Sequence, residues 1–362
     1  MEIGVAREIG RDEHRVALTP AAARQLVMEG HRVFVERDAG LESRFTDREY
    51  REAGAEILYA REEVIRRSGV VLGLGAPSMH DAAMLEAGQV VFGFQHLAVA
   101  PKELLYRLLE RRITAIGFEL IEEPDGRTPI LRAMSELGGQ MVVHLAAHLL
   151  EAESQGRGIL LGAVPGIGPA SVLVLGAGTV GRTAARILIA SGAHVVLLDR
   201  DLERLRRADQ ELSGRAETFI ADPETLAKFT RVADVVIGAV RVPGGRAPYL
   251  VSRAMVSEMR PGSVIIDVAI DQGGCVETSR PTTLAQPTFA VNEVVHYCVP
   301  NFTANIPRTA SKVLSLTHLP YVAGVARTGI EAARRKSEPI SRGIYLHDGG
   351  VLLPDLAARL GM

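Results

Sequence analysis

The sequence predicts an α/β protein built from two doubly wound domains, the first of them discontinuous. Short apolar segments alternate along the chain with segments of helical periodicity. The apolar segments are hydrophobic throughout, which is typical of parallel strands covered by helices on both faces. Glycine accounts for 36 of 362 residues, whereas aromatic residues make up 4% and tryptophan is absent. This composition also suits an α/β protein.

The expected strands follow one another through most of the chain, and helical periodicity precedes two of them, at residues 21–30 and 61–67. The strands are expected at residues 33–37, 69–75, 90–94, 114–120, 171–176, 194–199, 235–240 and 263–270.

A long amphipathic segment divides the chain into domains. Residues 129–153 have helical periodicity and lead through a glycine- and proline-rich loop to the strand at 171–175. We expect this helix to open a second, nucleotide-binding domain of residues 129–305. The tail from residue 311 has a helical pattern but is too short for a domain. Residues 1–128 and 306–362 are therefore assigned to a discontinuous first domain.

Composition argues against several classes of protein. Lysine and arginine number 41 against 43 acidic residues, a net charge of −2, so a nucleic-acid partner is not expected. The N-terminus carries Glu2, Arg7 and Glu8 and lacks the apolar core of a signal peptide. Only two cysteines occur, Cys275 and Cys298, which indicates a reduced, cytoplasmic protein.

Two further features do not support a membrane span or a metal site. The apolar stretch 159–180 contains Pro165, Pro169 and five glycines, which would leave backbone groups unpaired in lipid. His144 and His148 share a helix face as zinc ligands do, but the accompanying glutamate and a nearby third ligand are missing. We expect neither a membrane partner nor a metal.

The motif GAGTVG, residues 176–181, follows an expected strand and opens an expected helix. Gly176 permits a tight turn, Gly178 lets the backbone approach a pyrophosphate, and Gly181 lets helix and strand pack closely. Thr179 and Val180 lie at the helix start, where free N–H groups bind phosphate. The sequence therefore predicts a Rossmann-like dinucleotide site. Glycines that merely form a tight turn are the alternative.

Asp199 ends the next expected strand, 18 residues beyond Gly181, where a carboxylate can accept hydrogen bonds from ribose hydroxyls. This carboxylate favours NAD over NADP, because it would repel a 2′-phosphate. The adjacent Arg200 could accept such a phosphate if it turned inward. The alternative function for Asp199 is that of a helix cap.

Five further segments of the sequence are distinctive. They are EHRVALTP (13–20), FQHLA (94–98), MSELGG (134–139), GAVRVPGGRAP (238–248) and DVAIDQGGCVETSRPTT (267–283). Together they resemble the alanine dehydrogenase family, and the resemblance runs from residue 2 to the tail. The family shares its fold with the soluble part of proton-translocating transhydrogenase, and the resemblance implies a homo-oligomer, commonly a hexamer.

The resemblance implies roles for three charged or titratable residues. Arg15 matches the family's clamp for the substrate carboxylate, with a surface salt bridge to Glu13 as the alternative. His96 matches the active-site histidine, which holds the carbonyl oxygen or the attacking water, although it could be a core histidine. Asp271 matches the catalytic aspartate, and its alternative is the capping of a turn.

Three further residues are implied to touch the cofactor. Ser135 and Asn301 match positions at the nicotinamide end, although either could be a helix N-cap or an Asx-turn residue. Val240, in the segment 238–248, is counted with the cofactor-binding residues as well.

The sequence departs from the family pattern near the substrate. Gly75 stands where the family carries a lysine that binds the substrate, so one cation and its donors are missing. Gln95 replaces an apolar residue before His96, and Arg132 stands in a segment that is apolar in the family. Our hypothesis is that Gly75 enlarges the pocket and that Gln95 or Arg132 supplies a relocated polar contact. Arg132 could instead be a solvent-facing side chain at a helix start.

These observations predict an NAD-dependent amino-acid dehydrogenase that interconverts an L-amino acid or imine with a 2-oxo acid, with a substrate altered from alanine. One alternative is an NAD-binding protein without catalytic activity that serves as a sensor or partner subunit. The other is a saccharopine-type enzyme that condenses an amine with an oxo acid, which a wider pocket would admit.

Overall fold

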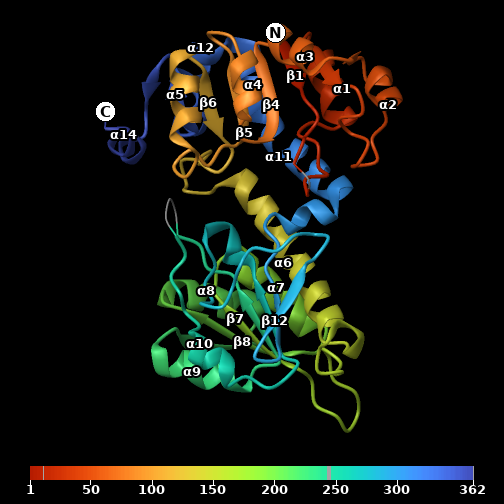
Figure 1. The fold of residues 1–362 in the computed structure, drawn as a ribbon, viewed down its shortest axis with the longest axis vertical. Helices are drawn as coiled ribbons and strands as arrows, with labels where there is room; N and C mark the ends of the chain where they lie inside the picture. The colour runs from red at the N-terminus through yellow and green to blue at the C-terminus, as the bar shows by residue number, and fades with distance from the viewer. Residues whose placement is uncertain (11, 243–245, 362) are drawn as a thin grey trace. The chain divides into compact units, whose positions relative to one another are not determined.

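The computed structural model describes residues 1–10, 12–242 and 246–361, which form two compact units. Unit 1 comprises Met1–Met134 and Ala304–Met362, and unit 2 comprises Ser135–Thr303. Each unit contains one largely parallel sheet with helices packed on it (Figure 1), which confirms the predicted fold class. The predicted division placed the whole of helix α6 (Pro129–Leu149) in the second domain, whereas the division in the structure falls within this continuous helix.

Unit 1 is built around an eight-stranded sheet of order β15-β14-β6-β5-β4-β1-β2-β3. Figure 1 shows α4 and α5 on the near side of this sheet and C-terminal helices, drawn in blue, behind it. The strands are β1 (Glu2–Val5), β2 (Arg32–Glu36), β3 (Glu56–Leu58), β4 (Val70–Gly75), β5 (Val90–Phe94), β6 (Thr114–Gly117), β14 (Ile344–His347) and β15 (Gly350–Val351). The helices are α1 (Pro20–Met28), α2 (Asp47–Glu52), α3 (Arg61–Arg67), α4 (Met79–Met84), α5 (Lys102–Glu110), α11 (Pro307–Thr328), α12 (Ile330–Lys336), α13 (Glu338–Arg342) and α14 (Pro354–Leu360).

The strands β1 to β6 pair in parallel, whereas β14 and β15 pair antiparallel at one edge of the sheet. The prediction of a wholly helical tail is therefore wrong for residues 344–351. The segment Ile344–Leu346 is apolar and buried against β6, so sheet pairing determines its conformation where a helical pattern in the flanking residues suggested otherwise.

Unit 2 contains a seven-stranded sheet of order β12-β13-β11-β10-β7-β8-β9. Its strands are β7 (Ser171–Leu175), β8 (His194–Asp199), β9 (Glu217–Ile220), β10 (Val235–Gly238), β11 (Val264–Asp267), β12 (Thr288–Val291) and β13 (Val294–Tyr297). Besides most of α6, its helices are α7 (Thr179–Ala190), α8 (Leu202–Leu212), α9 (Pro223–Val232) and α10 (Arg253–Ser257). Its short 3-10 helices are η1 (Ala152–Ser154) and η2 (Val268–Gln272). A third 3-10 helix, η3 (Phe302–Asn305), lies where the chain returns to unit 1.

The strand order of unit 2 places a topological switch point between β7 and β10. Neighbouring strands of this sheet are parallel, except for the antiparallel pair of β12 and β13 at one edge. The chain passes outward from β7 through β8 to β9 on one side and from β10 through β11 to β13 on the other. A crevice opens at such a reversal outside the carboxyl ends of the strands, which is where ligands of open α/β sheets bind.

The apolar stretch at residues 159–180 contains a loop, β7 and the start of α7, as the prolines and glycines indicated. Among the residues that the structure describes, no helix combines the length and apolarity needed to cross a bilayer.

Helix α11 supplies hydrogen bonds to a buried segment near the N-terminus. The segment 16–19 precedes α1 and is almost fully buried. The backbone N–H of Val16 donates to Ser311 Oγ at 2.9 Å, and that of Thr19 donates to Ser315 Oγ at 2.9 Å. Buried backbone groups require such partners, and here they lie about 300 residues away in the chain.

His318 of α11 makes a third contact with this segment. Its Nε2 lies 2.6 Å from the carbonyl oxygen of Ala17, so the neutral ring donates from Nε2. The imidazole is fully buried, and this burial lowers its pKa from 6.5 to about 4.

We predict that acid destabilises the wild type more than a His318→Gln variant, which keeps a donor but does not titrate. Between pH 6.5 and 4 the unfolded histidine binds a proton and the folded one does not, so the free energy of unfolding falls as the pH falls. The difference reaches about 3 kcal/mol at pH 4. Urea unfolding at several pH values measures it.

Burial also raises the pKa of Glu8 from 4.5 to about 7. The folded state therefore binds a proton that the unfolded state releases, and this group lowers the free energy of unfolding as the pH rises from about 4.5 to 7. Both proteins contain Glu8, so the comparison of the two cancels its effect. Identical pH dependence in both proteins would contradict the prediction.

Candidate active site

The glycine-rich turn of unit 2 lies at the carboxyl end of β7, beside the switch point. Gly176 has φ +105°, and a Cβ on it would lie 2.7 Å from the carbonyl oxygen of Ala239. A Cβ on Gly181 would lie 1.9 Å from the carbonyl oxygen of Gly176. Both positions therefore require glycine. A Cβ on Gly178, by contrast, would meet no atom within 4 Å, so this side of the turn is open.

The start of α7 faces this open side with backbone donors. The N-cap residue is Gly178, and no side chain caps the helix. Thr179 and Val180 form the first turn and are half-buried. The uncapped N–H groups, the positive end of the helix dipole and the missing Cβ of Gly178 together fit the pyrophosphate of a dinucleotide.

Asp199 ends β8 and holds the glycine-rich turn in place. Its Oδ2 accepts a hydrogen bond from Ala177 N at 2.7 Å, and its Oδ1 accepts one from Asp201 N at 2.9 Å. The N-cap of α8 is Asp201, so the helix-cap alternative for Asp199 is wrong. Each carboxylate oxygen has a further lone pair for a ribose hydroxyl. The adjacent Arg200 is exposed.

Two other side chains border the turn. Val240 follows β10 across the switch point, and its Cγ1 lies 3.2 Å from where a Cβ on Gly176 would be. Arg182 was not predicted from the sequence. Its Nη1 donates to Ala177 O at 2.7 Å and its Nε to Glu211 at 2.8 Å. Its place in the first turn of α7 could have indicated a position beside the glycine-rich turn. Basic residues are common on exposed helix faces, however, so the sequence alone did not distinguish it.

Asp271 and Asn301 are brought together at the same edge of the sheet. Asp271 lies in η2 directly after β11, and its Oδ1 accepts a hydrogen bond from Asn301 N at 3.3 Å. Both residues are exposed, and Asn301 has a left-handed φ of +51°. The N-cap of η2 is Asp267, which accepts from Ala269 N. Strands β11 and β7 are parallel, so Asp271 and the glycine-rich turn share the carboxyl edge of the sheet.

Helix α6 carries Arg132 and Ser135. The helix begins at Pro129, so Ser135 lies well inside it and the N-cap alternative is wrong. Ser135 is half-buried and Arg132 is exposed. A Cβ on Gly139 of the same helix would lie 2.7 Å from Val180 O, which shows that α6 packs closely on the start of α7.

In unit 1, Arg15 lies in the loop that α11 anchors. The side chain is 3% exposed, and its Nε and Nη2 donate to the two carboxylate oxygens of Glu13 at 2.7 and 2.5 Å. The predicted alternative of a salt bridge to Glu13 is thus present, although it is buried rather than at the surface. A buried, paired guanidinium has a fixed orientation, which suits a carboxylate clamp.

His96 follows β5 and adopts a strained backbone. Its φ is +42°, and its side chain is 61% exposed, so the alternative of a core histidine is wrong. The ring stacks on Phe94 with 6.2 Å between centroids. A left-handed conformation costs a non-glycine residue of order 1–3 kcal/mol and is common at functional sites.

Glu119 stabilises this conformation and was not predicted. Its Oε1 accepts hydrogen bonds from His96 N at 2.7 Å and from Tyr345 Oη at 2.8 Å, and lies 3.7 Å from His96 Nδ1. Glu119 is 7% exposed and therefore buried. The available signal was an acidic residue near the end of the apolar strand expected at 114–120.

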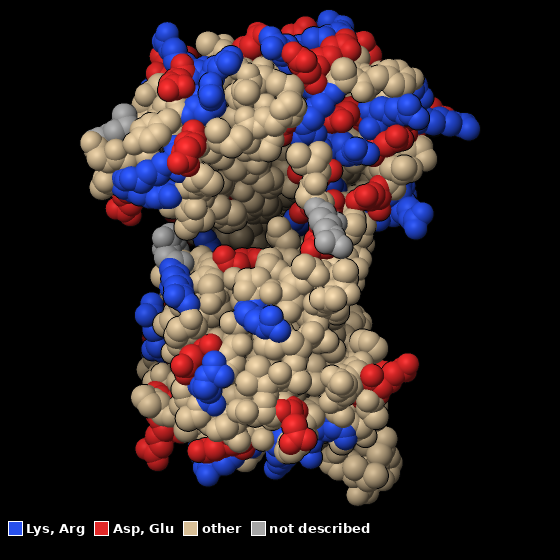
Figure 2. Space-filling view, viewed as in Figure 1, with Lys and Arg blue, Asp and Glu red and all other residues tan. Residues whose placement is uncertain are grey.

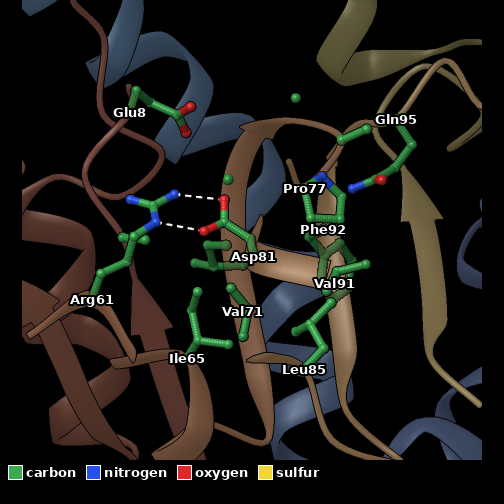
Figure 3. A pocket seen from close by; sticks show the side chains of 15 residues that line it. Glu8, Arg61, Ile65, Val71, Pro77, Asp81, Leu85, Val91, Phe92 and Gln95 are labelled. Atoms are coloured by element: carbon green, nitrogen blue, oxygen red, sulfur yellow. Dashed lines mark hydrogen bonds and ion pairs between the residues drawn. The ribbon is translucent and has the colours of Figure 1, made fainter. Parts of the chain in front are cut away.

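Gly75 and Gln95 line a pocket of about 50 Å³ at the carboxyl ends of β4 and β5 (Figure 3). Gly75 is exposed, and a Cβ on it would meet no atom within 4 Å. Gln95 is 2% exposed, and both polar atoms of its side chain lack a hydrogen-bond partner among the described residues. Glu8 also lines the pocket, and its Oε1 accepts a hydrogen bond from Leu74 N at 2.7 Å.

Charges of both signs alternate over the molecular face drawn in Figure 2, where acidic side chains lie close to basic ones. Such a surface lacks the uninterrupted basic footprint typical of nucleic-acid binding on the face shown.

Three residues of the family-like segment 238–248 lie outside the described residues, namely 243–245.

Comparisons with known proteins show similarity over most of the chain. Residues 4–138 match the N-terminal domain of the alanine dehydrogenase/PNT family, and residues 142–354 match its C-terminal domain. An alanine dehydrogenase of Halomonas elongata is 42% identical over 362 residues, which are 100% of this chain and 97% of the relative. One of Mycobacterium tuberculosis (strain CDC 1551) is 40% identical with the same coverage.

Solved structures show the same similarity. An L-alanine dehydrogenase superposes with a TM-score of 0.94 at 39% identity and covers 100% of this chain and 99% of its own. A transhydrogenase from Sinorhizobium meliloti shares the fold with a TM-score of 0.83 at 24% identity, covering 98% of this chain and 99% of its own. The chain therefore belongs to the alanine dehydrogenase/PNT family, whose members are pyridine nucleotide-dependent.

Proposed function

We propose that this protein is an NAD-dependent amino-acid dehydrogenase whose substrate differs from alanine. The observation that carries the proposal is the carboxyl edge of the unit 2 sheet, where a glycine-rich turn fit for a pyrophosphate and the carboxylate of Asp271 lie on one edge. Unit 2 then binds the cofactor, and unit 1 supplies Arg15 and His96 for the substrate.

The proposed reaction converts an L-amino acid, NAD and water into a 2-oxo acid, ammonium, NADH and a proton. NAD, when bound, accepts the hydride from the Cα atom. Arg15 pairs with the substrate carboxylate, and Asp271 accepts a proton from the amino group. His96, held by Glu119, hydrogen-bonds the attacking water and then the oxo oxygen.

NAD is the proposed cofactor because of Asp199, whose carboxylate ends β8 next to the turn. Ser135, Val240 and Asn301 are proposed to contact the cofactor too. Gly75 and Gln95 support an altered substrate, since one opens space and the other places a buried amide beside it. Arg132 is proposed as a further substrate contact on α6.

The same proposal covers location and assembly. Both cysteines of the sequence are buried and unpaired, which supports a reducing, cytoplasmic environment. The family resemblance supports a homo-oligomer, which we propose to be a hexamer. Light scattering of the purified protein measures this directly.

The test is oxidation of NADH with a panel of 2-oxo acids from pyruvate to long and dicarboxylic ones, each with ammonium and with primary amines. We expect turnover with ammonium and a 2-oxo acid other than pyruvate. Faster turnover with primary amines would support the condensing alternative. NADH binding without turnover would support the alternative of a sensor or partner subunit.

An Asp271→Asn variant is expected to lose at least 100-fold in kcat, because an amide cannot accept the proton. Its Oδ1 can still accept the hydrogen bond from Asn301, so NADH affinity is expected to change less than threefold. Steady-state kinetics and NADH fluorescence measure the two effects. Asp209→Asn, an exposed change on α8, is the control. Equal activity of Asp271→Asn and the control would exclude this role.

An Asp199→Asn variant is expected to lower the ratio of kcat/KM for NAD to that for NADP by at least tenfold. The amide keeps an acceptor for Ala177 N but loses the charge that strengthens ribose hydrogen bonds and repels a 2′-phosphate, a change of about 1.5–3 kcal/mol. Initial rates with both cofactors measure the ratio. An unchanged ratio would show that Asp199 only holds the turn.

A further inference from the structure

The pocket beside Gly75 lies within unit 1, between the ends of β4 and β5 and the helices α3 and α4 (Figure 3). A cavity needs roughly 10–15 Å³ to hold one water molecule. The volume of this pocket is about 50 Å³, so it admits a few non-hydrogen atoms. Its inner wall is apolar. The wall consists of Ile65, Val71, Leu72, Leu85, Val91 and Phe92.

Gly75 leaves the pocket accessible. It is exposed, and a Cβ at this position would meet no atom within 4 Å. The space next to its backbone is therefore open toward the side on which β4 ends. A ligand group can occupy this space without displacing an atom of the protein.

Gln95 supplies an unsatisfied polar group to this pocket. It is 2% exposed, and neither Oε1 nor Nε2 has a hydrogen-bond partner among the residues that the structure describes. Burial of such a group without a partner costs about 1–3 kcal/mol. A ligand with one donor and one acceptor would satisfy both atoms at once.

The charges around the pocket disfavour an acidic ligand. The guanidinium of Arg61 is bound by Asp81, with its Nε and Nη2 at 2.6 and 2.7 Å from the carboxylate oxygens. The carboxyl group of Glu8 faces the same space, and burial raises its pKa to about 7. A carboxylate that entered here would lie beside the carboxylate of Asp81 and, above about pH 7, beside the ionised Glu8.

The pocket adjoins the proposed substrate residues of the same unit. Glu8 lies close enough to Arg15 for their charges to interact, and Gln95 is joined by a peptide bond to His96. To fill this pocket, a substrate whose carboxylate pairs with Arg15 would have to direct its side chain toward Gln95.

We propose that this pocket receives the side chain of the amino-acid substrate, and that Gln95 pairs with a neutral hydrogen-bonding group at its end, such as a carboxamide. The inference rests on the proposed function and deepens it, because it specifies the substrate class as amino acids with short, neutral, polar side chains.

Three amino acids of nearly equal shape test the proposal. L-asparagine carries the carboxamide, L-aspartate a carboxylate, and L-leucine two methyl groups in the same positions. We expect kcat/KM for L-asparagine to exceed that for each of the others at least tenfold, because a site built for hydrogen bonds rejects analogues that cannot form them.

A Gln95→Leu variant is expected to lower the asparagine-to-leucine ratio of kcat/KM at least tenfold. Gln25→Leu makes the same replacement on the exposed face of α1 and is expected to keep the ratio of the wild type. Gly75→Ala, which narrows the pocket without a clash, is expected to disfavour L-asparagine relative to L-alanine. NADH fluorescence and circular dichroism show that each variant is folded.

The outcomes separate the pocket from the function. Turnover of amino acids with equal kcat/KM for the three isosteres, and an unchanged ratio in Gln95→Leu, would overturn the pocket assignment and leave the proposed dehydrogenase function in place. Binding of NADH without turnover of any amino or oxo acid would overturn both. Preference for L-aspartate would overturn the assignment of a neutral side chain.

Discussion

The placement of Arg15, the residue proposed to pair with the substrate carboxylate, depends on hydrogen bonds that α11 donates and accepts. The segment 16–19 is buried without strand partners, and side chains of Ser311, Ser315 and His318 pair with its backbone. These contacts join residues about 300 positions apart. Arg15 directly precedes the anchored segment, so the orientation of its guanidinium depends on a helix from the other end of the chain. The tail is therefore part of the first structural unit and not an appendage.

The sequence predicted the parts of this fold that local physics determines. Strands buried on both faces are apolar throughout, as 171–175 and 235–238 are, and these were located correctly. The short β9 is largely exposed and its pattern is weak, and β14 was hidden in a helical context. Their pairing depends on neighbours distant in the sequence, which no local pattern encodes.

The candidate site divides in the same way. The glycines at 176 and 181 could be predicted because a close backbone approach forbids any other residue. The bond between Asp271 and Asn301 could not, because it joins two loops 30 residues apart. Glu119 was missed for a similar reason: its function is visible only once β5 and β6 are paired and the N–H of His96 turns toward it.

The strain at His96 and the orphaned amide of Gln95 belong to one stretch of backbone, and each is costly in the absence of a ligand. A left-handed φ at residue 96 directs the imidazole into solvent while the preceding side chain stays buried. An extended conformation at residue 96 would turn the imidazole in another direction. Glu119 accepts a hydrogen bond from the N–H group of His96, and so one buried carboxylate stabilises the backbone conformation that presents the ring to solvent. The histidine proposed to hydrogen-bond the attacking water therefore depends on Glu119 for its orientation, and the amide proposed to select the side chain directly precedes it in the chain.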